Sequence, residues 1–301
     1  MPDTVPSVPE PAFKQPESLP GVPPSTIDSD THSAPNLDGD SQESHLQLLQ
    51  SHFSDKSKVY VRRLVKFLAL QTSDDATKSA PYLKPRPGLK LAAVLVVIFE
   101  REGLKTHGGQ TSLPGGKMDE GDEDVIETAL REAKEEIALP ANSNDDVKVL
   151  GTLEPHPFHG LTVVPVVAVS TNPKILDQLE PAQGEVDHIF SHPLEAILNP
   201  ELAPDLSESE HLVNHGSEYW PYENRYHDYI IAELGGISYR LHCFQTSASP
   251  ITGLTADVLI RTAELLYDRS TTYERHAPGQ IKSFEELVAV ANAHRSKDSR
   301  Q

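Results

Sequence analysis

Cysteine is almost absent from this chain, which has one, Cys243, among its 301 residues. A single cysteine excludes an intrachain disulfide and a cysteine-rich zinc site, and it fits a reducing compartment. We interpret Cys243 as a small buried apolar side chain. Long apolar runs are also missing, because the longest, such as residues 91–99, fall well short of the roughly 20 residues that a membrane-spanning helix needs.

Positive charge is scarce as well: 26 lysines and arginines face 45 acidic residues, for a net charge of −19. This balance argues against a non-specific grip on nucleic acid and against binding to anionic membranes, since both need basic patches. The N-terminus has no signal-peptide or transit-peptide pattern, and the chain ends in Ser-Arg-Gln rather than a peroxisomal Ser-Lys-Leu. We expect an intracellular protein, cytoplasmic or peroxisomal, that acts on a small molecule and not on nucleic acid or membranes. The oligomeric state stays open.

The chain divides into three predicted parts. Residues 1–43 are rich in Pro, Ser and Asp, so we expect a disordered acidic tail. Residues 44–278 carry the apolar periodicity of a folded domain, and residues 279–301 are expected to form a C-terminal helix and tail. Helices are predicted within 45–70, at 254–267 and at 284–294, and strands at 92–99, 147–153, 161–169, 185–190, 229–233 and 237–244. Their mixed order indicates an α/β fold rather than regular βαβ repeats.

Two features could suggest other sites. His211 and His215 have the spacing of a zinc pair, but no glutamate lies between them as in a zinc-protease helix, so a polar loop is the better interpretation. Aromatic residues in the expected long loop 199–227, among them Trp220, could stack on an adenine, although packing the loop onto the core is the more common use. Neither a nucleophile-elbow Gly-x-Ser-x-Gly nor a Walker loop is present.

A glycine-rich stretch followed by an acidic helix is the most informative part of the sequence. Gly115 and Gly116 can take a positive φ and let a ligand or metal approach the backbone closely. Asp122 or Asp124 could cap the helix that follows. In that helix, apolar and acidic residues separate by 3.6-residue spacing into two faces. Ile126, Leu130, Ala133 and Ile137 lie on the apolar face, and Glu132, Glu135 and Glu136 on the acidic one.

Three carboxylates within one helical turn repel each other, and a divalent cation reverses that repulsion. Mg²⁺ and Mn²⁺ prefer such hard oxygen ligands and would also neutralise the oxygens of a bound diphosphate. Arg131 supplies the fixed positive charge beside the cluster and could orient a glutamate through a bidentate pair. A bare acidic helix is more often a solvated face, so the glycine loop at a fixed distance is what favours a site here.

This arrangement resembles the Nudix box, G-x5-E-x7-R-E-U-x-E-E-x-G-U, where U is a large apolar residue. Gly116 matches its first glycine, and residues 131–136, Arg-Glu-Ala-Lys-Glu-Glu, match its most diagnostic part. Two positions depart: Asp122 replaces the first glutamate with eight residues instead of seven before Arg131, and Ala138 replaces the late glycine.

The resemblance implies a Nudix fold, a mixed sheet sandwiched between helices, and metal-dependent hydrolysis of a nucleoside diphosphate linkage. It implies that Glu132, Glu135 and Glu136 hold Mg²⁺ or Mn²⁺, with Asp122 as a further candidate ligand. Water made more acidic by the metal would attack phosphorus, and Glu135 or Glu136 would take its proton, with Glu185 as an alternative base.

The longer spacing, with the stretch around Thr128-Ala-Leu-Arg-Glu, is similar to the coenzyme A diphosphatase branch of that family. Residues 104–110, Leu-Lys-Thr-His-Gly-Gly-Gln, resemble the segment which that branch uses for coenzyme A recognition, so Arg101, Lys105 and His107 are predicted to contact the substrate. The resemblance covers roughly residues 58–278, but the arginine-bearing stretch that usually precedes this segment is replaced by residues 96–100. Three alternatives stay open: another nucleotide substrate such as ADP-ribose, NADH or an oxidised nucleotide; a catalytically inactive binding module; and a partner-binding role for the tail.

Overall fold

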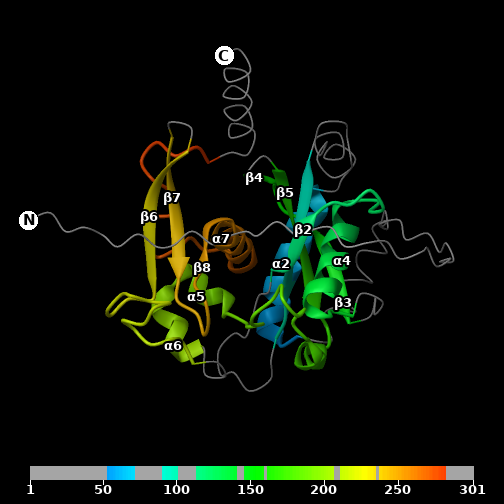
Figure 1. Ribbon diagram of the computed structural model, residues 1–301, viewed down its shortest axis with the longest axis horizontal. Coiled ribbons are helices and arrows are strands. Elements are labelled where there is room, and N and C mark those ends of the chain that lie inside the picture. Colours follow the sequence, from blue (N-terminus) through cyan, green and yellow to red (C-terminus); the bar gives the residue numbers. More distant parts are fainter. Residues whose placement is uncertain are drawn as a thin grey trace, which may run out of the picture. The chain divides into compact units, whose positions relative to one another are not determined.

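The computed structural model describes residues 53–71, 90–100, 113–140, 146–158, 161–206, 211–234 and 237–282 (Figure 1). All of them belong to the compact unit Gly39–Gln301. The predicted tail 1–43, the segment with Arg101, Lys105 and His107, and the predicted helix 284–294 lie outside the described residues. The domain boundaries expected from the sequence therefore stay predictions.

The larger of two sheets in the described residues is mixed and has five strands. Strand β1 (Leu91–Ile98) runs parallel to β5 (Leu161–Ser170), and the short β2 (Gly115–Lys117) pairs antiparallel with β1 on its other side. Strands β3 (Val147–Thr152) and β4 (His156–Phe158) both pair antiparallel with β5. Because β1 and β5 are covered on both faces, they are almost continuously apolar, as the sequence predicted.

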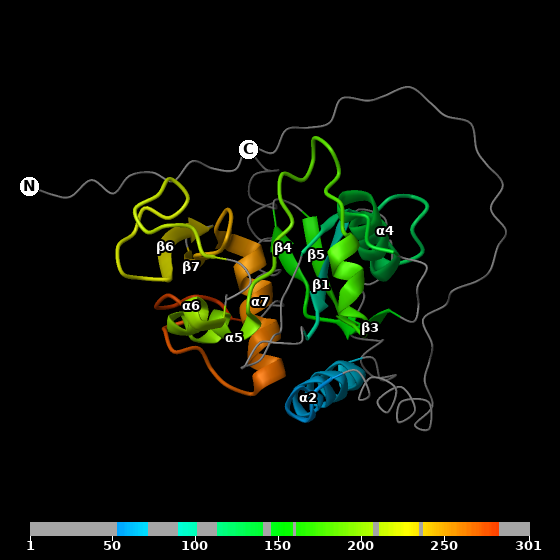
Figure 2. The same ribbon diagram turned by 90° about the horizontal axis from the view of Figure 1, so that it is seen from below.

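Helices cover both faces of this sheet (Figure 2). On one face, Leu95 and Val97 of β1 pack with the apolar side of α4 (Val125–Ile137). On the other face, Val96 and Ile98 pack with α2 (Asp55–Gln71) and α7 (Gly253–Tyr267). Alternate residues of one strand thus serve two cores, which confirms the predicted sheet between helices.

A second sheet contains β6 (His227–Leu234), β7 (Ile237–Phe244) and β8 (Ile251–Thr252) in that order, with β7 between the other two. The connections carry short helices, namely η1 (Pro173–Gln178), α5 (Leu194–Leu198), η2 (Pro200–Leu202) and α6 (Ala203–Leu206). Trp220 is fully buried in the predicted long loop and donates to Arg225 O at 2.7 Å, so it packs the loop. His215 lies 3.2 Å from Tyr222 O, in keeping with a polar loop.

The strand predicted at 185–190 is wrong. This segment is irregular, and the turn just before it closes the C-terminal end of α4. The amides of Glu180 and Ala182 donate to Ile137 O and Glu136 O at 3.2 and 2.8 Å. Helix carbonyls at this end have no partner inside the helix, so the chain uses residues 180 and 182, just before the predicted strand, to satisfy them. As a result Glu185 comes close to the acidic face of α4.

Among the residues that the structure describes, none of the helices combines the length and the apolar character that crossing a bilayer would require.

Candidate active site

The two glycines of β2 allow the strand to lie against both β1 and α4. A Cβ on Gly115 would lie 2.3 Å from Ala93 O, and a Cβ on Gly116 would lie 2.3 Å from Glu132 Oε1. Neither glycine uses the positive φ that its residue type allows, because neither is among the described glycines with that conformation. Glycine is required for close packing instead, and at Gly116 the atom that comes close belongs to a predicted metal ligand.

Asp124 caps the N-terminal end of α4. Its side chain accepts hydrogen bonds from the amides of Ile126 and Glu127 at 2.8 and 3.0 Å. Of the two caps considered from the sequence, Asp124 therefore is the one observed. At the other end, Ala138 adopts the left-handed conformation with φ 54°, and the Leu139 amide donates to Ala133 O at 3.1 Å. This is a helix C-cap that glycine usually fills, so the late glycine of the box corresponds here to a helix terminator.

Asp122 does not cap α4, and its side chain is buried, with only 7% of the residue's surface exposed. Its Oδ1 accepts from Arg131 Nε, and its Oδ2 accepts from Arg131 Nη2, both at 3.0 Å. The Thr128 hydroxyl and the Asp119 amide also donate to Oδ2, each at 2.9 Å. Burial disfavours the charged form, but hydrogen bonds from Arg131, the Asp119 amide and Thr128 outweigh it and lower the pKa of Asp122.

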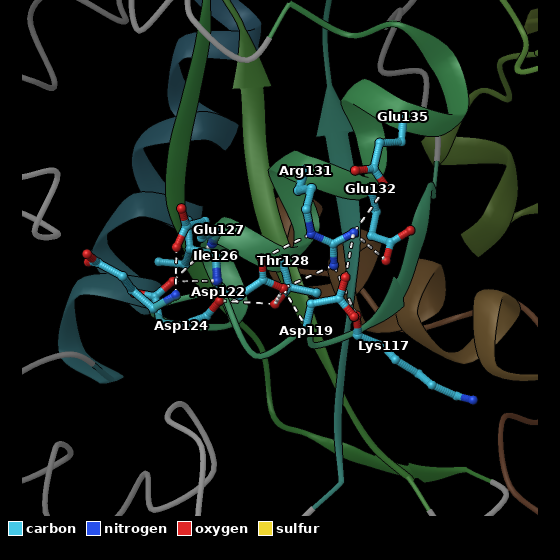
Figure 3. Close-up of polar contacts among 11 residues, drawn as sticks. Lys117, Asp119, Asp122, Asp124, Ile126, Glu127, Thr128, Arg131, Glu132 and Glu135 are labelled. Carbon is cyan, nitrogen blue, oxygen red and sulfur yellow. Dashed lines mark hydrogen bonds and ion pairs between the residues drawn. The ribbon is translucent and has the colours of Figure 1, made fainter. Parts of the chain in front are cut away.

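Arg131 is the centre of the cluster (Figure 3). Besides Asp122, it contacts Glu132 Oε1 at 3.0 Å and Glu135 Oε2 at 3.1 Å, both through Nη1. Its Nη2 donates to Lys117 O at 3.1 Å, and this contact ties α4 to β2. The hydrogen bonds that Arg131 donates to Asp122, with the nearby acidic charges, raise the pKa of Arg131 although burial opposes the charged form. One fixed cation therefore sits among several carboxylates.

Two of the helix carboxylates are partly withdrawn from water. Burial raises the pKa of Glu132, although the charge of Arg131 opposes the shift. Burial also raises the pKa of Glu136, which accepts from the Gly115 amide at 3.0 Å and is repelled by Glu132, Glu185 and Glu135. Glu185, in the turn after η1, thus lies near enough to Glu136 to add a further negative charge beside this cluster. The sequence carries one signal for this turn, the glycine at position 184. In the structure Gly184 has a φ of 89° and turns the chain just before Glu185.

Comparison with known proteins supports the resemblance. A family model described as NUDIX domain matches residues 90–213. Nudix hydrolase 22, chloroplastic, from Arabidopsis thaliana is 32% identical over 233 residues, which cover 69% of this chain and 68% of that protein. The chain belongs to the Nudix hydrolase family.

Two other Nudix relatives match this chain over somewhat shorter segments. Nudix hydrolase 15, mitochondrial, from Arabidopsis thaliana is 34% identical over 207 residues, and the match spans 63% of each protein. The mitochondrial coenzyme A diphosphatase NUDT8 from Mus musculus is 33% identical over 175 residues, 58% of this chain and 70% of its own length. The chain thus spans somewhat less than two thirds of the first of these relatives.

The Nudix carboxylates have the chemistry for a divalent cation, but they do not converge on one point as they stand. Within the described part of the chain, no three acidic, histidine or cysteine side chains surround a common metal position. Glu132 and Glu135 face Arg131 through one oxygen, and Glu136 faces the Gly115 amide through one oxygen. The donors are hard oxygens, two of the carboxylates are partly desolvated, and the negative charge exceeds what Arg131 balances. In its chemistry, this donor set fits Mg²⁺ or Mn²⁺, which prefer hard oxygen ligands.

The structure therefore brings together the following predicted residues: Gly115, Gly116, Asp122, Arg131, Glu132, Glu135 and Glu136. The predicted recognition residues Arg101, Lys105 and His107 lie outside the described residues, and their role stays a prediction. Sequence reasoning missed Thr128 and the Asp119 amide, because nothing in a single sequence indicates which hydroxyl or amide a buried carboxylate will meet.

Proposed function

We propose that this Nudix hydrolase cleaves the diphosphate linkage of coenzyme A or an acyl-coenzyme A, giving 4′-phosphopantetheine and adenosine 3′,5′-bisphosphate. The observation that carries the hydrolase proposal is the cluster of carboxylates on α4 and its neighbours that share a single arginine. The substrate rests on residues 104–110, on the spacing of the box, and on the relative named a mitochondrial coenzyme A diphosphatase.

In this proposal Glu132, Glu135 and Glu136 hold Mg²⁺ or Mn²⁺. When bound, the cation would make a water more acidic and neutralise diphosphate oxygens. Asp122, which the sequence offered as a further ligand, uses both oxygens to hold Arg131. We therefore assign Asp122 to positioning Arg131 rather than to the cation.

Glu136 is our first candidate for the proton acceptor. Its raised pKa makes it a stronger base than an exposed glutamate, and its Oε2 is fixed by the Gly115 amide. Oε1 is then the oxygen that takes the proton as water oxygen bonds to phosphorus and the bridging phosphorus–oxygen bond breaks. Glu135 and Glu185 are the alternative proton acceptors. Arg131 holds the carboxylates in position and offsets part of their negative charge.

The first experiment incubates purified protein with coenzyme A, ADP-ribose and NADH, with Mg²⁺ and then Mn²⁺, and separates the products by chromatography. Glu136→Gln is compared with Glu127→Gln, an exposed glutamate of the same helix that binds the Glu123 amide instead of the cluster. We expect adenosine 3′,5′-bisphosphate from coenzyme A, a loss of about 100- to 10,000-fold in kcat for Glu136→Gln, and near-normal turnover for Glu127→Gln.

Two other outcomes would change the proposal. Preferred cleavage of ADP-ribose or NADH would keep the chemistry and replace the substrate. No cleavage by folded, metal-binding protein would favour an inactive binding module. For substrate recognition, replacing Arg101 and Lys105 by alanine should raise KM for coenzyme A and leave KM for ADP-ribose unchanged.

A further inference from the structure

Asp122 is both shorter and farther from Arg131 in sequence than the glutamate of the Nudix box, yet it grips Arg131 with both oxygens. A shorter side chain on a longer loop has more ways to miss its partner. Gly121, which precedes it, has no neighbouring atom within 4 Å of where a Cβ would lie. No neighbour packs where a Cβ of Gly121 would lie, so the carboxylate has to be held by the hydrogen bonds that it accepts, among them the one from the Asp119 amide.

The Thr128 hydroxyl is placed to do this. Thr128 is fully buried on α4, and its Oγ1 lies 2.9 Å from Asp122 Oδ2 (Figure 3). The same oxygen lies 3.1 Å from Asp124 O, but a hydroxyl has a single hydrogen to donate. A carboxylate is the stronger acceptor, and it is also the closer one. Because Thr128 is fully buried within α4, its hydroxyl gives Oδ2 a fixed partner.

We propose that Thr128 is a positioning residue: with the Asp119 amide, its hydroxyl holds Asp122 Oδ2 so that Asp122 fixes the Arg131 guanidinium against Glu132 and Glu135. The chain of contacts runs from Thr128 to Asp122 to Arg131, and from Arg131 Nη1 to the two glutamates. This inference rests on the proposed hydrolase function only for its kinetic consequence. The geometric part applies to the protein whatever it cleaves.

The chain offers a matched control. Thr262 on α7 is also a fully buried helical threonine, and its hydroxyl donates to Val258 O at 2.8 Å, one turn back. If Thr128 only bonded back to its own helix, its replacement by valine would behave like Thr262→Val. If it positions Asp122, the two variants will differ at the site although they lose the same group.

The experiment compares Thr128→Val, Thr128→Ser and Thr262→Val by three measurements. The first is solvent exchange of the Arg131 Nε–H in metal-free protein by NMR, assigned with Arg131→Lys. The second is Mn²⁺ affinity by calorimetry, and the third is kcat and KM. For Thr128→Val we expect faster Nε–H exchange, about tenfold weaker Mn²⁺ binding and about tenfold lower kcat with little change in KM. Thr128→Ser should restore most of each, and Thr262→Val should match the wild type.

An unchanged Arg131 Nε–H signal in folded Thr128→Val protein would overturn the inference, as would equal effects of Thr128→Val and Thr262→Val. Failure of the proposed function is a separate outcome. In that case wild-type protein cleaves none of the diphosphates, while the exchange and Mn²⁺ measurements still decide whether Thr128 positions Asp122.

Discussion

Two groups of charged side chains in this member of the Nudix hydrolase family use the same residue types in different proportions. Around α4, Arg131 is within 4 Å of four carboxylates, those of Asp119, Asp122, Glu132 and Glu135. Around α7, each carboxylate has its own partner. Glu154 pairs with Arg261 at 2.8 Å, Glu264 pairs with Arg275, and Asp257 accepts from the Tyr239 hydroxyl at 2.8 Å.

Raised pKa values occur in both groups and therefore do not tell a site from a structural network. Burial raises the pKa of Glu136 near α4 and also raises the pKa of Asp257 and Glu264 on α7. What separates the groups is the ratio of acids to cations. Excess carboxylate charge is unfavourable until a cation is added, whereas the matched pairs of α7 are satisfied as they are.

The largest effect that tests this contrast is expected at Gly116. In Gly116→Ala the new Cβ would meet Glu132 Oε1, so the carboxylate has to move. A displacement of about 1 Å at a reacting centre costs roughly 100-fold in rate, so we expect kcat/KM to fall by about that factor. The measurement is steady-state kinetics at saturating Mg²⁺, with the melting temperature recorded beside it.

Gly121→Ala is the control, because a Cβ at Gly121 has no atom within 4 Å, and its activity should stay within about twofold of wild type. Gly115→Ala should instead lower stability, since the clash at 2.3 Å is with the backbone oxygen of Ala93. Normal kinetics in Gly116→Ala would mean that the described position of Glu132 is not the functional one.

The next effect concerns pH and the α7 group. Burial raises the pKa of Asp257 from 3.8 to about 6, so the fold favours its protonated form. Its contribution to stability is complete below pH 3.8 and is lost as pH rises through about 6. Asp257→Asn removes this loss and keeps an acceptor for Tyr239. We therefore expect the free energy of unfolding of the variant, relative to that of the wild type, to increase by on the order of 2 kcal/mol as the pH rises from 4 to 7. The measurement is urea unfolding at each pH.

Glu154 supplies the control of opposite sign. Burial disfavours its charge, but the hydrogen bond and the charge of Arg261 lower its pKa below 4.5. Its contribution to stability is present above pH 4.5 and is lost as pH falls through the lowered value. Glu154→Gln should therefore be less stable than wild type at pH 7, with the deficit shrinking below pH 4.5. If both variants changed in the same direction, the α7 charges would not be matched as described.

The sequence predicted those parts of the molecule that depend on periodicity. Alternation and apolar runs predicted β1, β5 and the β6–β7 hairpin, and the 3.6-residue spacing predicted α4 with its acidic face. The strand prediction at 185–190 is wrong because the apolar pattern there is that of a strand, while the residues just before it, 180 and 182, are bound to the carbonyls at the end of α4. Such tertiary demands leave no periodic signal.

Within the site, the sequence identified residue types better than their partners. It predicted the Arg131 and glutamate cluster, but it gave Gly115 and Gly116 a conformational role where the structure shows close packing. The sequence also left two roles open for Asp122, as a cap of the helix or as a metal ligand. The distance from Asp122 to Arg131 depends on how the loop folds back, and a spacing in sequence does not determine that.

The smallest predicted effect separates chemistry from helix termination at the end of α4. Ala138 is exposed and holds φ at 54°, a conformation that costs an L-residue about 1 kcal/mol and costs glycine almost nothing. Ala138→Gly should therefore raise the free energy of unfolding by about 0.5 kcal/mol, after the greater freedom of glycine in the unfolded chain is included, and leave kcat/KM unchanged. Ala138→Val should lower stability, because a branched side chain fits this conformation poorly. Calorimetric melting of the three proteins gives the order glycine, alanine, valine if the cap persists in solution. A change in kcat/KM without that order of stabilities would mean that the glycine of the Nudix box acts in the reaction itself. Its replacement by Ala138 would then weaken the site on α4, an effect that a comparison of charges on α4 and α7 does not detect.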